Sequence, residues 1–371
     1  MKLLMDNNLT IILLLKGRDA FTIRWFEHAK EFKLPYHVIV ADGGDDNGLE
    51  KKLRNNEYHL TVSYDYVRYP FDKNHKLFYA KIHSALNKVE TPYVVLASND
   101  DFYFFDALNE SVSFLKENAE YVSSRGELWD FSVLPTLKRG IALEKSVIYG
   151  SISNISKLYE HPTVIGDCAM DRVVDYSSKA NSIWHDVVRT KNLKESYGAL
   201  IESNVNDLVF SDILIGFMMA SQGKIHRGCN LYMLHQCHPD MAALTDLHDT
   251  PLDWIDAPGW DSDFNRFLDT VAVQISKVDQ VAFYEAKCKI LKAYTDSILL
   301  QKMKDHILLL TSGMNNKTTA TGFIKTALRK NKQLFSVLKI MHSLIPAKIV
   351  NNQIPSSFIP KIDVITKFLK K

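Results

Sequence analysis

The chain has 371 residues and carries 45 Lys and Arg against 43 Asp and Glu, a formal net charge of +2. Hydrophobic residues make up 46% of it, with only 15 Gly and 11 Pro, which excludes disordered, collagen-like and disulfide-scaffold proteins. The small net charge argues against a general nucleic-acid-binding protein, which would carry a large basic excess. The four Cys lack close regular spacing and indicate reduced thiols of a cytoplasmic protein.

Targeting and membrane-spanning segments are not expected. Polar residues at 6–8 interrupt any signal-peptide apolar region before it begins. The apolar run at 9–15 is far shorter than the roughly 20 residues that span a bilayer, and no other stretch approaches that length. The sequence therefore predicts a soluble or peripheral protein.

The first 125 residues alternate strand-like and helix-like patterns. Strands are predicted at 9–15, 36–40, 60–67, 93–97 and 121–123, and helices at 21–32, 75–89 and 107–117. Strands separated by helices of about ten residues or more indicate crossover connections and a mainly parallel sheet. In such sheets the ligand lies beyond the carboxyl ends of the strands.

The second half of the chain has a different pattern. Periodicity weakens at 130–200, as expected for a region with loops. A helix is predicted at 208–222 and ends at Gly223, a strand-like segment rich in His and Cys follows at 226–238, and the chain is helical from 264 onward.

The C-terminal tail differs in charge from the rest of the chain. Residues 313–371 hold eleven Lys and Arg and one acid, a net charge of +10, whereas residues 1–312 hold 34 basic and 42 acidic residues, a net charge of −8. An apolar stripe runs along 324–345 beside basic residues, which favours an interfacial helix on anionic lipid. A solvated surface helix, a nucleic-acid arm and a helix packed on the domain or on a partner are the alternatives.

Two acidic clusters follow predicted strands, at 42–46 and at 99–101. The adjacent carboxylates of Asp100 and Asp101 repel each other unless a cation or a hydrogen-bond network compensates, and Mg²⁺ or Mn²⁺ shared with substrate phosphates is the usual solution. In the other cluster, Gly43 allows a ligand to approach the backbone closely, and Asp42 could accept a hydrogen bond from a base or ribose. The alternative for both clusters is a solvated turn whose Asp caps the next helix.

Several stretches together resemble a family of bacterial GT-A-type glycosyltransferases, which use nucleotide-sugars to build surface polysaccharides. The matching segments are LLLKGRDAF, HVIVADGGD, KLFYAKIHSALNKVETPYVVLASNDDF, FSDILIGFMMASQGKIHRGCNLYMLHQ and LDWIDAPGWDSDF, within residues 8–300. The resemblance implies an α/β, GT-A-like fold, with a mainly parallel Rossmann-type sheet flanked by helices and a basic helical C-terminal extension. It divides the chain into a GT-A-like domain at 1–270, with a nucleotide-binding half at 1–125 and an acceptor half at 126–270, and a helical region at 271–371.

The resemblance also implies roles for individual residues. Asp100, with help from Asp101, would hold the metal that neutralises the diphosphate, although an acid more often stands where this chain has Asn99. The residues implied to bind the nucleotide-sugar are Arg18, Asp42, Gly43, Lys81, Asn99 and Asp100.

An inverting enzyme of this class needs a general base for the acceptor hydroxyl. Asp212 resembles the base-bearing residue at the start of the helix in FSDILIGFMMASQGKI, and Asp207 is the next candidate. A carboxylate at a helix start also simply interacts well with the helix dipole.

The segment at 226–238 contains three His and two Cys, all of them metal-ligand types. Their spacing matches no common zinc module. The alternatives are structural histidines, a structural zinc site, or His235 and His238 acting as metal or diphosphate contacts.

We therefore expect a metal-dependent glycosyltransferase with Mn²⁺ or Mg²⁺, a nucleotide-diphosphate sugar donor and a glycan acceptor, in O-antigen, lipopolysaccharide or capsule synthesis. The acceptor is expected to be lipid-linked, and the protein to be peripheral at the inner face of the cell membrane. No nucleic-acid partner is expected, and a homo-oligomer is left open. The alternatives are a sugar nucleotidyltransferase and a catalytically inactive, membrane-recruited scaffold for glycan assembly.

Overall fold

The computed structural model of the protein describes residues 7–46, 48–134, 147–158, 162–178, 182–238, 251–300, 303–304 and 354–370. The apolar stripe at 324–345 that the sequence assigns to a membrane surface lies outside these residues. No helix within the described ranges is both long enough and apolar enough to cross a bilayer.

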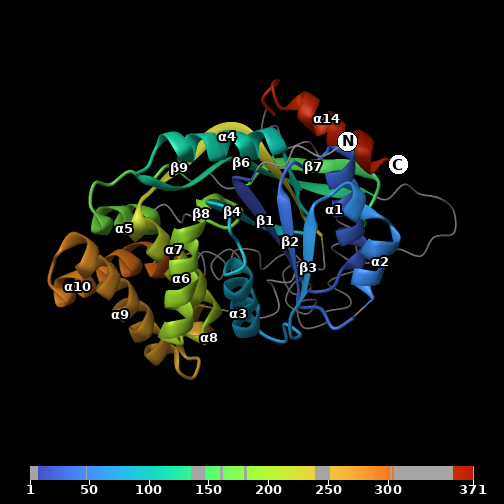
Figure 1. The fold of residues 1–371 in the computed structure, drawn as a ribbon. Helices are drawn as coiled ribbons and strands as arrows, with labels where there is room; N and C mark the ends of the chain where they lie inside the picture. The colour runs from blue at the N-terminus through green and yellow to red at the C-terminus, as the bar shows by residue number, and fades with distance from the viewer. Residues whose placement is uncertain are drawn as a thin grey trace, which may run out of the picture.

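The centre of the molecule is one sheet of nine strands (Figure 1). The strands are β1 (Leu9–Leu15), β2 (His37–Asp42), β3 (Tyr64–Arg68), β4 (Tyr93–Ser98), β5 (Phe102–Tyr103), β6 (Tyr121–Leu134), β7 (Ser151–Lys157), β8 (Val187–Arg189) and β9 (Lys224–Gln236). Their order is β3-β2-β1-β4-β8-β6-β9-β5, and β7 pairs with the C-terminal part of β6. The first four strands are parallel. Beyond them β8 runs antiparallel to both of its neighbours, while β6 and β9 are parallel to each other.

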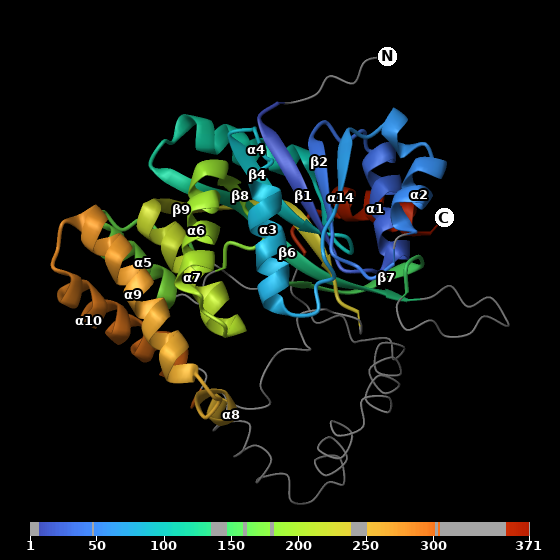
Figure 2. The same cartoon turned by 60° about the horizontal axis from the view of Figure 1, so that its bottom comes forward.

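Helices cover both faces of the parallel half (Figure 2). The helical elements before the tail are α1 (Asp19–Glu31), α2 (Leu49–Asn55), η1 (Tyr58–Leu60), α3 (His75–Leu86), α4 (Phe105–Glu117), α5 (Ala169–Ser178), α6 (Thr190–Ser203), α7 (Leu208–Gln222), α8 (Pro251–Ile255), α9 (Trp260–Asp279), α10 (Phe283–Tyr294) and η3 (Thr295–Leu299). One face packs against α3, α6 and α7, with α5, α9 and α10 outside them, and the other against α1, α2 and α4.

The burial of β1 explains why its sequence is a continuous apolar run. Ile12 and Leu14 enter the core on the α3 side, whereas Ile11 and Leu13 enter the core on the α1 side. Because helices cover both faces of this strand, neither face meets water, and the sequence does not alternate between polar and apolar residues. The positions of the parallel strands, and of the turns that follow them, are thereby fixed.

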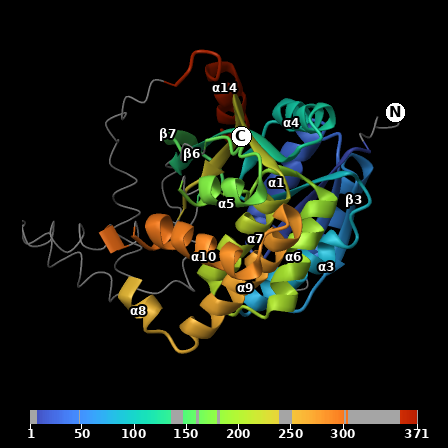
Figure 3. The ribbon, with the colours of Figure 1, turned by 90° about the vertical axis from the view of Figure 1, so that its left-hand side faces the viewer.

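The last described helix, α14 (Ile359–Leu369), lies against a third apolar cluster formed by β5, β6 and β9. Figures 1 and 3 both show it on the side of the molecule away from α9 and α10. Its apolar residues Ile362, Ile365, Phe368 and Leu369 are buried there. This described part of the basic tail therefore packs on the domain, which is one of the alternatives that the sequence left open.

The structure confirms the expected α/β class with a sheet flanked by helices. The main difference from the expected, mainly parallel sheet is that its second half is mixed. The region at 130–200, expected to be rich in loops, contains β7, α5, β8 and α6, and β6 extends to Leu134. Two features explain why the sequence pattern did not predict these elements. Strand β8 has only three residues, and the buried positions of α6 (Leu193, Tyr197 and Leu200) alternate with many polar ones.

Candidate active site

A cavity of about 650 Å³ opens where β1 and β4 end. Its walls come from the turns after these two strands, from α3, α6 and α7, and from residues 182–186, which precede β8. The polar side chains among its lining residues include Lys16, Arg18, Asp100, His185, Asp212 and His235. The position agrees with the rule that parallel sheets bind ligands beyond the carboxyl ends of their strands.

The turn after β4 presents Asp100 to this cavity and turns Asn99 away from it. The Asn99 side chain is 1% exposed, and its Nδ2 donates to Thr22 Oγ1 at 2.9 Å. The same nitrogen lies 3.3 Å from the backbone oxygen of Arg18. Asn99 therefore joins the turn after β4 to the turn after β1 and does not line the cavity.

Asp100 is held between two basic side chains. Its Oδ2 accepts from Arg18 Nη1 at 2.6 Å and lies 2.7 Å from His238 Nε2. Its Oδ1 is buried without a hydrogen-bond partner among the described residues. Burial raises the pKa of Asp100, but the hydrogen bond to His238 and the charge of Arg18 outweigh it and hold the pKa well below its usual value. Asp100 is thus an anion with one unused oxygen.

Asp101 lies behind Asp100 and does not line the cavity. Its Oδ1 accepts from the Gln236 backbone amide at 3.3 Å, and its Oδ2 is 3.9 Å from His185 Nε2. Complete burial, together with the negative charge of Asp100, raises the pKa of Asp101 to about 7. The two expected metal-binding carboxylates therefore have different environments.

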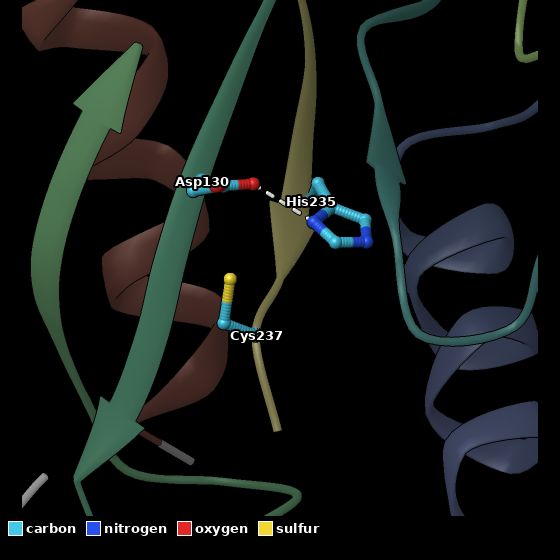
Figure 4. A group of neighbouring side chains, drawn as sticks. All are labelled: Asp130, His235 and Cys237. Atoms are coloured by element: carbon cyan, nitrogen blue, oxygen red, sulfur yellow. Dashed lines mark hydrogen bonds and ion pairs between the residues drawn. The ribbon is translucent and has the colours of Figure 1, made fainter. Parts of the chain in front are cut away.

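His235, expected to join Asp100 and Asp101, instead contacts Asp130 (Figure 4). Its Nδ1 lies 2.8 Å from Asp130 Oδ1, and the two residues are register partners on β9 and β6. Cys237 lies two residues further along on the same side, and the three potential ligand atoms are all within 4.8 Å of one another. Burial lowers the pKa of His235, but the Asp101 charge and the Asp130 hydrogen bond raise it to about 11. His235 is thus a cation paired with carboxylates at the edge of the cavity.

The two candidate bases lie in different environments. Asp212 faces the cavity, and Tyr79 donates its hydroxyl hydrogen to Asp212 Oδ1. Asp212 is an exposed residue of the cavity wall, and desolvation by the surrounding protein raises its pKa, while the hydrogen bond from Tyr79 opposes this. Asp207 is the N-cap of α7: its Oδ1 accepts from the Phe210 amide at 2.9 Å and its Oδ2 from Trp254 Nε1 at 2.7 Å.

The turn after β2 is closed by contacts within the protein. Asp42 is 2% exposed; its Oδ2 accepts from Arg68 Nη1 at 2.5 Å and from the Tyr66 hydroxyl, and its Oδ1 from the Gly44 amide at 2.8 Å. A Cβ at Gly43 would lie 2.4 Å from the carboxyl group of Asp72, so close internal packing accounts for this glycine.

Lys81 lies beneath the same turn and does not reach the cavity. Its Nζ forms an ion pair with Asp72 and donates to the backbone oxygen of Leu15 at 2.7 Å. Both side chains are buried, and burial lowers the pKa of Lys81 although the charge of Asp72 opposes this. This is the geometry of a buried structural ion pair.

His185 is a cavity residue that the sequence reasoning missed. Its Nδ1 lies 2.6 Å from the Tyr103 hydroxyl, and its backbone has a φ of 74°, in the left-handed region. Burial and the charge of His235 lower its pKa to about 3, so it is neutral. Trp184 beside it stacks on Phe78 of α3 with ring centroids 6.0 Å apart. A run of aromatic and polar residues just before a short apolar segment, IWHDVV, was the available signal.

The site and fold define an α/β protein with a cavity that carries fixed acidic and basic groups at the carboxyl edge of its parallel strands. No family model matches the sequence, and no curated protein matches it. Among solved structures the chain is similar to S. aureus TarS. A crystal structure of TarS 1-349 gives a TM-score of 0.43 and 13% sequence identity, covering 86% of this chain and 78% of that chain.

Two further structures of S. aureus TarS are similar to the chain. The complex of TarS 1-349 with UDP-GlcNAc gives a TM-score of 0.43 and 13% identity, covering 98% of this chain and 88% of that one. A longer TarS chain gives the same score and identity, with 97% of this chain and 53% of that one covered. At these scores and identities the similarity assigns no substrate and no residue role to this chain.

Proposed function

We propose that the protein is a glycosyltransferase that moves a sugar from a nucleotide-diphosphate donor to a hydroxyl group of a glycan acceptor. One observation carries this proposal: Asp100, Arg18 and Asp212 line the same cavity. The positive charge of Arg18, suited to a diphosphate, and the carboxylate of Asp212, suited to proton transfer, therefore face one cavity. A diphosphate leaving group and an acceptor hydroxyl need these two kinds of group in the same site.

The donor diphosphate would lie at the end of β1 and β4. Arg18 and the exposed Lys16 supply positive charge there, and Arg18 is already oriented by Asp100. The orphaned Oδ1 of Asp100 suits a hard divalent cation such as Mg²⁺ or Mn²⁺, which takes one or two protein carboxylates and completes its coordination with phosphate oxygens and water. When bound, such a metal would neutralise negative charge on the departing diphosphate.

The acceptor would enter beside α7. Asp212 takes the proton from the acceptor hydroxyl, and the hydroxyl oxygen forms a bond to the anomeric carbon. The bond between that carbon and the diphosphate oxygen breaks, and the nucleoside diphosphate leaves with its electron pair. The raised pKa of Asp212 supports this role because it brings the carboxylate closer in basicity to the working pH.

The test of this proposal is a screen of nucleotide-sugars with Mn²⁺ or Mg²⁺ and glycan acceptors, which measures release of nucleoside diphosphate. Acceptor-dependent release from one donor supports the proposal. Pyrophosphate release from a nucleoside triphosphate and a sugar phosphate would instead identify a sugar nucleotidyltransferase. A protein that binds none of UDP, GDP and CMP in calorimetry would be the non-catalytic scaffold.

The acceptor in this proposal is a lipid-linked glycan of O-antigen, lipopolysaccharide or capsule synthesis, reached at the inner face of the membrane. The support is charge: seven Lys and Arg against one acid in 305–353, next to a net acidic body. Polybasic segments bind anionic lipid with about 1 kcal/mol per basic residue.

Membrane binding is tested on the full chain with vesicles that contain anionic lipid. Neutralising four tail residues should abolish sedimentation with the vesicles, whereas a control of equal charge change in the body should retain it. The tail variant is Lys325→Gln, Arg329→Gln, Lys330→Gln and Lys332→Gln, and the control is Lys51→Gln, Lys73→Gln, Lys88→Gln and Lys116→Gln. Equal binding by the two variants would contradict membrane recruitment by the tail.

A further inference from the structure

The C-terminal helix α14 is integrated into the domain through several kinds of contact. Phe358 and Ile362 enter the cluster that contains Trp129 and Phe131 of β6. The Leu369 carbonyl accepts from the Gly150 amide at 2.8 Å. At the other end of the helix, Lys361 forms an ion pair with Asp106 of α4 at 2.7 Å. Apolar burial, a backbone hydrogen bond and an ion pair thus fix α14 in one orientation.

Phe368 brings α14 next to the strand that follows the acidic turn. Its ring lies 5.9 Å from that of Phe102, the residue after Asp101, in an edge-to-face arrangement. The ring of His28 on α1 lies 5.6 Å from Phe368 and 5.1 Å from Phe102. The ring of Phe102 is therefore packed from two sides by α1 and α14.

Arg24 completes the connection from this aromatic cluster to the turn after β4. Its guanidinium lies over Phe102, 4.7 Å from the ring centroid, and its Nη2 donates to the Asp100 backbone oxygen at 2.9 Å. Its Nη1 donates to Gln236 Oε1 at 2.7 Å, and the Gln236 amide in turn donates to Asp101. Arg24 is 1% exposed, so this buried charge depends on these contacts for its stabilisation.

We propose that α14 positions the Asp100–Asp101 turn, so that docking of a helix from the far end of the chain is needed to form the site. Phe368 and Arg24 are positioning residues, because they touch Phe102 and the Asp100 carbonyl and do not line the cavity. Undocking α14 removes one side of the packing around Phe102 and frees the turn. Only the expected effect of α14 on turnover rests on the proposed function; the positioning of the turn does not.

The test uses the full chain with Phe368→Asp, which places a charge in the apolar cluster and undocks α14. Hydrogen exchange of residues 359–369 reports undocking, and exchange at 99–104 reports the turn, where the Phe104 amide donates to the Tyr232 oxygen at 3.0 Å. We expect exchange at 99–104 to become at least tenfold faster while β1 and β2 keep their protection. Val364→Asp, on the exposed side of α14, is the matched control and should change neither segment.

Phe368→Tyr, which keeps the ring, should restore slow exchange at 99–104 and separates positioning from loss of the helix. Undocked α14 with unchanged exchange at 99–104 would overturn the inference, whether or not the protein transfers sugar. Unfolding of β1 and β2 in the Phe368→Asp protein would also overturn it, because the helix would then act on global stability alone. In an active enzyme the same variant should lower kcat at least tenfold with little change in acceptor KM.

Discussion

The two acidic turns of the parallel sheet have similar sequences and different environments. After β2, both oxygens of the Asp42 carboxylate accept hydrogen bonds, from Arg68, Tyr66 and the Gly44 amide. After β4, Asp100 lines the cavity and keeps one oxygen without a hydrogen-bond partner among the described residues. An acidic turn at a strand end can therefore be closed by contacts within the protein or can line a cavity. The two turns differ in whether the carboxylate lines the cavity and in whether one of its oxygens lacks a hydrogen-bond partner within the part of the chain that the structure describes.

The largest expected effect comes from removing the negative charge of Asp100 in the turn after β4. Asp100→Asn keeps the shape of the side chain but leaves Arg18 and His238 without their anion. We expect kcat for sugar transfer to fall about 10³-fold, as for loss of a major electrostatic contact to the leaving group. Steady-state kinetics with saturating donor measure this change.

Asp42→Asn is the matched control in the other turn and should leave kcat within a few-fold of the parent protein. A fall in kcat as large as that of Asp100→Asn would contradict the division between the two turns. A higher donor KM at constant kcat would instead support the predicted contact of Asp42 with the nucleotide.

Asp212→Asn should lower kcat about 10²-fold, because it removes the proton acceptor from the cavity while the donor side stays intact. The donor KM should change little. Asp207→Asn is the control, since asparagine also caps helices well and the α7 N-terminus would keep its partner. Equal losses of kcat in the two variants would show that turnover depends on the start of α7 and not on a proton acceptor at Asp212.

A substitution beneath the turn after β2 should lower the stability of the protein rather than its turnover. Lys81→Met leaves Asp72, which is 0% exposed, without its ion-pair partner. Breaking a buried pair costs about 3–5 kcal/mol, so the thermal unfolding midpoint should fall while the donor KM of the folded enzyme is retained. Lys52→Met, which breaks the exposed pair with Asp19, should leave the midpoint unchanged. A raised donor KM in Lys81→Met would restore the predicted contact of Lys81 with the nucleotide.

The sequence was sufficient for elements whose pattern is strong and local. Strand β1 and helix α7 have the predicted bounds, because one is an uninterrupted apolar run and the other ends at Gly223. The position of both acidic turns followed from the strands before them. The closure of one turn did not, since Arg68 and Tyr66 come from β3, 24 or more residues after Asp42.

Long-range pairing also explains the contacts at the site that the sequence did not predict. His235 contacts Asp130 because β6 and β9 pair in parallel, a register between segments 105 residues apart that no local pattern encodes. His185 lies in a left-handed conformation before a strand of three residues, so neither periodicity nor turn composition identifies it. The packing of α14 behind Phe102 depends on a helix more than 250 residues away in sequence.

The smallest expected effect tests the support behind the turn after β4. His28 lies among Phe32, Phe102, Phe105 and Phe368, and burial, with a smaller contribution from the charge of Arg24, lowers its pKa from 6.5 to about 3. The unfolded chain therefore binds a proton at His28 that the folded chain does not. The stability from this group is complete above pH 6.5 and declines as the pH falls toward 3, by about 2 kcal/mol at pH 5.

His28→Phe, which cannot be protonated, should flatten this part of the stability profile in urea unfolding between pH 7 and pH 5. His59→Gln, at an exposed position, should keep it. Because His28 contacts Phe102 and Phe368, acid should also speed hydrogen exchange at 99–104 before it affects the turn after β2. An unchanged profile in His28→Phe, or earlier loss of protection after β2, would show that the aromatic cluster does not support the turn after β4 specifically.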